Sequence, residues 1–316
     1  MIDYHAAPRP LLGIALKVIS TLAFASMITV IKLVSDRYPI GEMVFFRSFF
    51  ALIPVLIWVG WRSEIPRVFK TSNFRGHVIR SFAGGGGMFC GFSAISFMPI
   101  ADATAIGYAA PLITVMLGYF LLGENVRLYR WSAVVVGFIG VLIILSDYFG
   151  PEAHSGGSAV EIGAIFAIVG AFFSGLAATQ VRTLTRFESA GTIVIYFSLL
   201  TSAAALVTLP FGWIVPTPFD ATLLVFAGIF GGVGQVLQTL SYRYGEVSVV
   251  APFEYTSMIW ILAVSFVIFG TWPTWVVLLG TAIIIGADLF VIYREQRLGI
   301  ERRRAKAAQT PPAPLS

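Results

Sequence analysis

Ten long apolar segments, separated by short breaks, constrain this chain more than any other feature of its sequence. Each is about 20 residues long, the length a helix needs to cross the hydrocarbon core of a bilayer. Because lipid cannot bond exposed backbone groups, and the segments are too uniformly apolar for alternating barrel strands, they predict transmembrane helices. A chain of eight or nine spans with one re-entrant segment is the alternative. The expected spans are 11–34, 40–61, 74–97, 101–122, 128–146, 160–182, 189–210, 220–242, 247–269 and 273–293.

Composition excludes several classes of protein. Only 12% of the 316 residues are charged, against about 25% in soluble domains, which excludes a soluble enzyme and a disordered chain. The basic residues form no face that could follow a phosphate backbone, so we expect no nucleic-acid partner. A single cysteine, Cys90, excludes an intrachain disulfide. The chain has no phosphate loop, dinucleotide fingerprint, nucleophile elbow or histidine cluster, so we expect no enzyme activity, cofactor or metal site.

The distribution of basic residues predicts the orientation. With the N-terminus in the cytoplasm, sixteen of the 21 lysines and arginines fall in cytoplasmic loops and tails, and only Arg37 falls on the other side. Such an excess marks cytoplasmic loops, so we expect both termini to be cytoplasmic.

The two halves of the chain repeat. Several residues match at an offset of 150, and a glycine cluster matches at 147: Gly13 with Gly163, Lys32 with Arg182, Gly41 with Gly191, Ser48 with Ser198, and Gly84 to Gly87 with Gly231, Gly232 and Gly234. Because each copy holds five spans, an odd number, the second copy must enter the membrane inverted, as in many secondary transporters. The expected division is an N-terminal cytoplasmic tail (1–10), a first five-helix repeat (11–146), a periplasmic linker (147–159), a second five-helix repeat (160–293) and a basic cytoplasmic tail (294–316) without a fold of its own.

Ionisable residues inside the spans are the first candidates for a substrate site, because burying a charge in hydrocarbon is costly. Arg47 is a candidate clamp for an anionic or polar group; its structural alternative is a pair with Glu42 or a helix-end carbonyl. Glu254 is a candidate hydrogen-bond acceptor or proton-coupled carboxylate; its alternative is an ion pair with Arg80 or Arg243. We expect Asp288 and Lys17 to extend to the cytoplasmic interface.

Interrupted spans and deep polar side chains add further candidates. Pro111 and Pro252 interrupt the fourth and ninth spans at corresponding places, which is typical of a transport site and also of packing kinks. Deep tyrosine, tryptophan and glutamine side chains suit recognition of a flat, hydrogen-bonding ligand, although hydrogen bonds between helices are their structural alternative. The candidate substrate-binding residues are Arg47, Tyr108, Glu254, Tyr255, Trp260, Gln235 and Gln238.

Several motifs resemble the EamA type of the drug/metabolite transporter superfamily. They are Phe45-Phe46-Arg47-Ser48 in the second span and Gly123-Glu124 after the fourth, placed on the duplicated five-helix frame. The resemblance covers roughly residues 11–293. It implies a ten-helix bundle in the bacterial inner membrane, with the cavity between the halves. The second repeat departs from it, because Phe269-Gly270-Thr271 stands where family members often carry Gly-Glu.

The segment Ala251-Pro252-Phe253-Glu254-Tyr255 resembles the branch that holds riboflavin importers and S-adenosylmethionine importers. We expect import of a small polar, planar metabolite, with riboflavin first, since a cationic sulfonium would favour more intramembrane carboxylates than Glu254 and Asp288. The alternatives are S-adenosylmethionine import, export of amino acids or drugs on the same fold, and a non-transporting scaffold. The expected partners are a small-molecule substrate and the bilayer. Direction, ion coupling and oligomeric state stay open.

Overall fold

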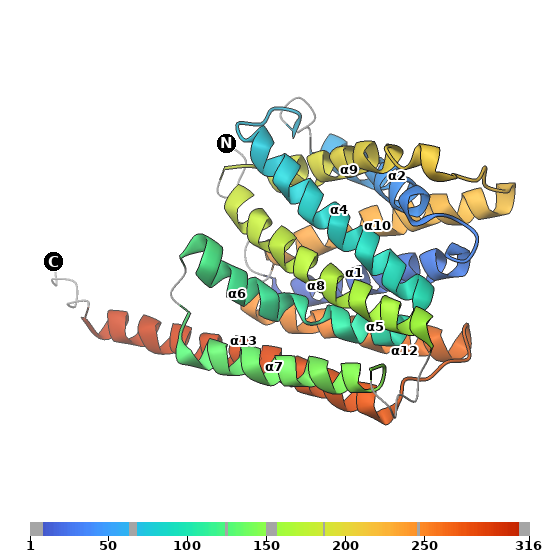
Figure 1. Ribbon diagram of the computed structural model, residues 1–316. Helices are drawn as coiled ribbons and strands as arrows, with labels where there is room; N and C mark the ends of the chain where they lie inside the picture. Colours follow the sequence, from blue (N-terminus) through green and yellow to red (C-terminus); the bar gives the residue numbers. More distant parts are fainter. Residues whose placement is uncertain are drawn as a thin grey trace.

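The computed structural model describes residues 9–62, 68–123, 126–149, 157–185, 187–244 and 247–309, and the regular structure of these residues is helical (Figure 1). The first half contains α1 (Pro10–Val34), α2 (Ile40–Trp61), α4 (Phe74–Phe97), α5 (Ile100–Gly107), α6 (Ala110–Leu122) and α7 (Leu128–Ser146). The second half contains α8 (Ser158–Leu184), α9 (Ala190–Leu206), the 3-10 helix η1 (Leu209–Phe211), α10 (Pro218–Tyr244), α11 (Val247–Val250), the 3-10 helix η2 (Ala251–Tyr255), α12 (Thr256–Val267) and α13 (Trp275–Gln309). Each of the ten predicted spans corresponds to a helix or to a run of short helices.

Most of these elements have the length and apolarity of membrane spans. Among the described residues, seven candidate spans qualify by length and hydropathy, and two shorter apolar helical segments, Ala190–Leu206 and Ala251–Val267, join them. The remaining span is α4, which is less apolar because it carries Arg80 and four consecutive glycines. The chain is therefore an all-helical, multi-pass membrane protein.

Local sequence explains where the helices begin and end. The Asn73 side chain accepts a hydrogen bond from the Gly76 amide at 2.9 Å and caps the start of α4. The Ser189 hydroxyl accepts one from the Thr192 amide at 3.1 Å and caps α9. Gly123 ends α6 with a φ of +63°, a conformation that a residue with a side chain rarely adopts. These caps permit the short loops on which the bundle depends.

Packing between helices follows the duplication. The most extensive contacts are α4 with α8, α1 with α10, α2 with α10, α7 with α13, and α2 with α9. Exchanging the two halves converts α4–α8 into α1–α10 and leaves α7–α13 and α2–α9 unchanged. The same exchange converts α2–α10 into α4–α9, which is the less extensive contact of the two. Figure 1 shows α7 beside α13 and α4 beside α8. The halves thus pack around a pseudo-two-fold axis, as two inverted repeats require.

The two ends of the bundle differ in charge. We call the end at which α1 begins the basic end; there the Arg9 amide donates to the Tyr244 carbonyl at the end of α10. We call the other the acidic end. At the acidic end Tyr38 donates to Asp220 at 2.8 Å, and Thr274 donates to Asp147 at 2.8 Å.

Lys32 lies at the acidic end. A lysine is unexpected there, because basic residues favour the cytoplasmic side of a membrane protein. The structure accounts for it, because the ammonium group donates to the Ile95 carbonyl at 2.6 Å near the end of α4. Hydrogen bonds between helices therefore close this end of the bundle.

The C-terminal tail differs from the expectation. Residues after 293 were predicted to lack a fold, but α13 continues to Gln309. The added residues are rich in arginine, alanine, lysine and glutamate, which are strong helix formers even without a packing partner.

Candidate functional site

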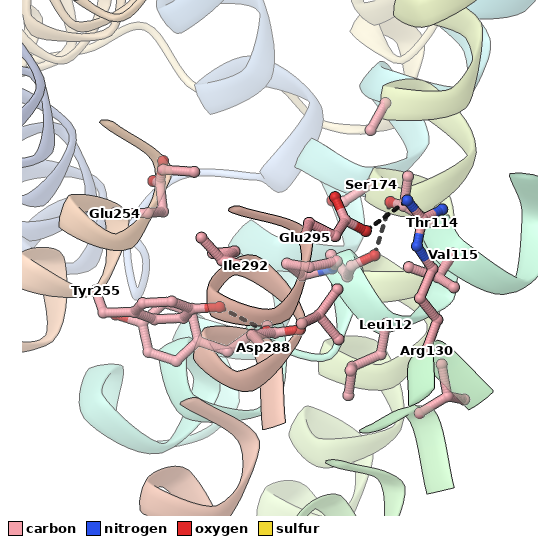
Figure 2. Close-up of a pocket in the computed structure, with 18 of the residues that line it drawn as sticks. Leu112, Thr114, Val115, Arg130, Ser174, Glu254, Tyr255, Asp288, Ile292 and Glu295 are labelled. Carbon is pink, nitrogen blue, oxygen red and sulfur yellow. Dashed lines mark hydrogen bonds and ion pairs between the residues drawn. The ribbon is translucent and has the colours of Figure 1, made fainter. Parts of the chain in front are cut away.

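A cavity of about 1200 Å³ lies between the two halves of the chain. The first half contributes the junction of α5 and α6 and the start of α7, and the second contributes α8, α10, η2 and α13. Figure 2 shows the cavity from close by. Its polar lining consists of Tyr108, Thr114, Arg130, Ser174, Gln238, Tyr242, Glu254, Tyr255, Asp288 and Glu295.

Two broken spans form one side of the cavity. α5 ends at Gly107 and α6 begins at Ala110, with Pro111 in its first turn. The ninth span breaks likewise into α11, η2 and α12, with Pro252 in η2. Proline has no amide hydrogen and clashes with the preceding turn, so a continuous α-helix is disfavoured at both places. The interruption of both spans is confirmed, and both breaks face the same cavity.

A tyrosine pair stands where the broken spans meet. The rings of Tyr108 and Tyr255 pack edge to face, with centroids 5.2 Å apart. The hydroxyls of Tyr108 and Ser257 are hydrogen-bonded at 2.7 Å. The Tyr255 hydroxyl donates to an Asp288 carboxylate oxygen at 2.6 Å, as Figure 2 shows. Both ring positions are thereby fixed.

Glu254 forms an ion pair with Lys17 of α1. The Lys17 side chain is fully buried, whereas 40% of the Glu254 side chain is exposed to the cavity. The expectation that Lys17 extends to the interface is wrong, because the carboxylate and the Tyr242 ring, 5.3 Å from the ammonium, hold it inside. The partner of Glu254 is Lys17 and not Arg80; the side chain of Arg243 lies outside the described residues.

Asp288 also differs from the expectation. It was predicted at the membrane interface, but it is only 7% exposed and lines the cavity. Asp288, Val291, Ile292 and Glu295 follow one another on a single face of α13, with helical spacing. That periodicity, visible in the sequence, is the signal that could have placed Asp288 and Glu295 in the site.

The cavity reaches toward the basic end. Arg130, near the start of α7, forms an ion pair with Glu295 of α13 at 2.5 Å. Figure 2 shows the two side chains reaching toward each other beside Thr114 and Ser174. Neither Arg130 nor Glu295 was among the sequence candidates, because both lie close to predicted span ends.

Three of the seven sequence candidates do not line the cavity. The Trp260 indole donates to the Thr21 hydroxyl at 3.3 Å and so joins α12 to α1. Arg47 is buried, with its Nε 3.5 Å from the Met27 sulfur. The Gln235 side-chain oxygen is buried without a hydrogen-bond partner among the described residues. The other four, Tyr108, Glu254, Tyr255 and Gln238, do line the cavity.

The charge of the cavity is predominantly negative. Glu254, Asp288 and Glu295 line it, with Arg130 as the one basic lining residue of the described part of the chain. Glu254 and Glu295 each have a cationic partner. Asp288 has no ion pair among the described residues, and accepts only from the Tyr255 hydroxyl. A buried carboxylate beside two aromatic rings favours a ligand that carries positive charge.

Comparisons with known proteins agree with this architecture. A sequence model described as "EamA-like transporter family" matches residues 11–146 and 161–293. An S-adenosylmethionine uptake transporter of Rickettsia bellii is 27% identical, over 90% of this chain and 95% of its own. A riboflavin transporter of Rhizobium johnstonii is 28% identical, over 65% of this chain and 66% of its own. A solved crystal structure shares the fold with a TM-score of 0.62 at 19% identity, covering 87% of this chain and 95% of that one.

Proposed function

Because this chain belongs to the EamA-like transporter family, and is a secondary transporter rather than an enzyme, we propose that it imports a small organic cation of the S-adenosylmethionine class. The observation that carries the proposal is Asp288, a buried carboxylate without a cationic partner among the described residues, beside the Tyr108–Tyr255 pair. We further propose that the protein resides in the bacterial inner membrane with both termini in the cytoplasm.

The chemistry of the ligand matches the two parts of the site. A sulfonium group gains from a carboxylate and from aromatic faces, and both interactions strengthen when water is excluded. A purine ring stacks on tyrosine, and Gln238 offers a donor and an acceptor to its edge. The sequence argument against this substrate counted too few intramembrane carboxylates; the cavity has three, including Glu295.

Riboflavin, the first expectation from the sequence, is the weaker candidate. It is uncharged, so it gains no ion pair with Asp288, and its binding would require that carboxyl group to take up a proton or to stay charged without a cation. The matched riboflavin transporter also spans a smaller share of this chain than the matched S-adenosylmethionine uptake transporter. Riboflavin therefore serves as the comparison ligand in the test.

The test measures the thermal stability of the purified transporter with each ligand in turn. A ligand that binds the folded state raises the melting temperature by mass action. We expect a saturable rise with S-adenosylmethionine and a smaller one with S-adenosylhomocysteine, which lacks the sulfonium charge. In the Asp288→Asn variant the affinity for S-adenosylmethionine should fall about tenfold or more, while that for S-adenosylhomocysteine changes little.

A matched control removes a carboxylate elsewhere. Asp36 is exposed and lies outside the cavity, so Asp36→Asn should leave both affinities unchanged. A larger rise with riboflavin than with S-adenosylmethionine would overturn the assignment. Uptake of labelled S-adenosylmethionine into cells that express the protein then tests the direction of transport.

A further inference from the structure

A second polar cluster lies outside the cavity, between α2, α4 and α9. Arg47 of α2 and Arg80 of α4 both approach the ring of Phe197 of α9, with guanidinium carbons 5.9 Å and 4.1 Å from its centroid. Each arginine stands about two helical turns inside its span. Two cations thus share one aromatic ring within the membrane-spanning part of the bundle.

Neither arginine has an anionic partner among the described residues. Nη1 of Arg47, together with Nε and Nη1 of Arg80, is buried and lacks a hydrogen-bond partner there. The carboxylates that the sequence offered as partners are engaged elsewhere. Glu42 accepts from the Ile214 amide at 3.1 Å, and Glu254 forms its ion pair with Lys17. Glu188 accepts from Thr71 and Ser72. Because both guanidinium groups approach the same ring, their like charges also repel each other.

Two residues with hydroxyl groups follow Phe197 on α9. Ser198 follows Phe197 directly, and Thr201 lies one turn further along the same helix. Both are buried, and their oxygen atoms have no hydrogen-bond partner within the described part of the chain. A hydroxyl that lacks an acceptor in an apolar interior carries a desolvation penalty, which an anion would relieve.

Glycines accommodate the two cations. A Cβ on Gly84 would collide with Nη1 of Arg80, and one on Gly231 would lie 3.0 Å from Nε of Arg47. The Arg80 guanidinium therefore occupies space that a side chain at Gly84, one turn along α4, would fill, and the Arg47 guanidinium lies against Gly231 of α10. Arg47 is buried, and Arg80 keeps its Nε and Nη1 atoms inside the bundle.

The charge balance requires a counter-ion. Arginine does not deprotonate in proteins, so burial cannot neutralise these residues. An uncompensated buried charge is strongly destabilising, and one phenyl ring supplies only a weak attraction to two cations. We propose that Arg47, Arg80, Ser198 and Thr201 bind one small monovalent anion, either chloride or a carboxylate group.

The experiment measures the melting temperature of the purified full-length transporter in detergent at constant ionic strength. The bulky polyhydroxy anion gluconate is replaced stepwise by chloride in one series and by acetate in another. We expect a saturable rise of several degrees. Saturation by chloride alone assigns a halide-type ion, whereas saturation by acetate at lower concentration assigns a carboxylate. No substrate is present, so the result is independent of the proposed cargo.

Substitutions connect the effect to the cluster. Arg80→Gln and Arg47→Gln should abolish the anion-dependent rise, and Arg37→Gln, which changes a half-exposed arginine of the acidic end, should retain it. Because the arginine variants can lose folding altogether, Ser198→Ala and Thr201→Val provide milder tests, in which the half-saturating anion concentration should rise severalfold. The proposal is overturned when neither anion raises the melting temperature, or when these variants respond like the wild type.

Discussion

Lys17 and Glu254 form an ion pair that joins the two halves of the chain at the edge of the cavity. The lysine is fully buried and the carboxylate is partly exposed. Losing the partner should therefore cost more stability when the lysine is left than when the glutamate is left. Removing Glu254 leaves a buried ammonium, whereas removing Lys17 leaves a carboxylate that the cavity can hydrate.

We therefore expect Glu254→Gln to lower the free energy of unfolding more than Lys17→Met does, by about 2 kcal/mol against about 1 kcal/mol after allowing for exposure. The double variant should lose less than the two single losses combined, because no charge is left unpaired. Chemical or thermal unfolding of the four proteins measures this cycle. Additive losses would show that the pair has no energetic coupling.

Glu188, in the loop before α9, connects that loop to the chain preceding α4. Burial acts to raise the pKa of Glu188, but hydrogen bonds from Thr71 and from the amide and hydroxyl of Ser72 outweigh it and lower the pKa. Because the pKa is lowered in the folded state, the ionised Glu188 side chain makes its full contribution to stability at pH values above the ordinary pKa of glutamate. This stabilisation is lost as the pH falls through the lower value of the folded state.

The Glu188→Gln variant should consequently be less stable than the wild type by about 1 to 2 kcal/mol near neutral pH. The difference should shrink as the pH falls below about 4. Melting temperatures of both proteins between pH 3 and pH 8 measure it. Glu161→Gln, at the start of α8, is the control; a difference that persists unchanged at pH 3 would contradict the assigned hydrogen bonds.

The sequence predicted individual site residues only in part. Glu254, Tyr108 and Tyr255 were found because a charged or aromatic residue near a proline break is an unusual feature inside a span. Asp288 and Lys17 were misplaced because depth along a helix was judged without the rotation that directs a side chain inward. Arg80 was considered only as a partner of Glu254, because contact with Phe197 depends on how α4 and α9 pack.

At the scale of elements, α7 and α13 approach each other closely through a glycine on each helix. A Cβ on Gly280 would lie 2.6 Å from the Gly140 carbonyl, and one on Gly140 would lie 2.8 Å from the Gly280 carbonyl. Small residues at such crossings let membrane helices pack without a hydrophobic driving force.

Gly280→Ala should therefore push the two helices apart and cost roughly 1 to 3 kcal/mol of stability. Gly286, on the same helix, has open space at its Cβ position, so Gly286→Ala is the matched control and should be neutral or slightly stabilising. Thermal unfolding of the two variants in one detergent compares them directly. Equal losses would contradict the packing.

The elements themselves were largely predictable. Apolar runs bounded by prolines, glycines and charges gave the ten spans, and the paired prolines gave both interruptions. The helical continuation of α13 was missed, since the spans were predicted from apolar runs and the residues after 293 are mostly polar. The duplication predicts helix packing only in part. Symmetry requires that contacts occur in related pairs, but it does not determine which helices are in contact.

At the scale of the whole molecule, the cavity reaches toward the basic end, while hydrogen bonds close the acidic end. Under the proposed orientation this is an inward-facing arrangement. Alternating access then requires contacts such as Thr274 to Asp147 to open while the basic end closes.

A single-cysteine variant tests this arrangement. In a Cys90→Ala background, Val291→Cys, which lines the cavity, should react with an impermeant thiol reagent faster in inside-out vesicles than in right-side-out vesicles. Adding Thr274→Val removes a hydrogen bond of the acidic end and should speed labelling from the other side. Preferential labelling in right-side-out vesicles would contradict the proposed orientation or the direction of opening.

The exchange of helix pairs around the pseudo-two-fold axis has a practical consequence. The α1–α10 and α4–α8 contacts replace each other when the repeats exchange conformations. Building the first repeat on the backbone of the second, and the second on that of the first, therefore gives a model of the outward-open conformer. Distances between spin labels attached across the bundle can be compared with those expected for the two conformers. The structure of one conformer therefore provides the reference for detecting the other.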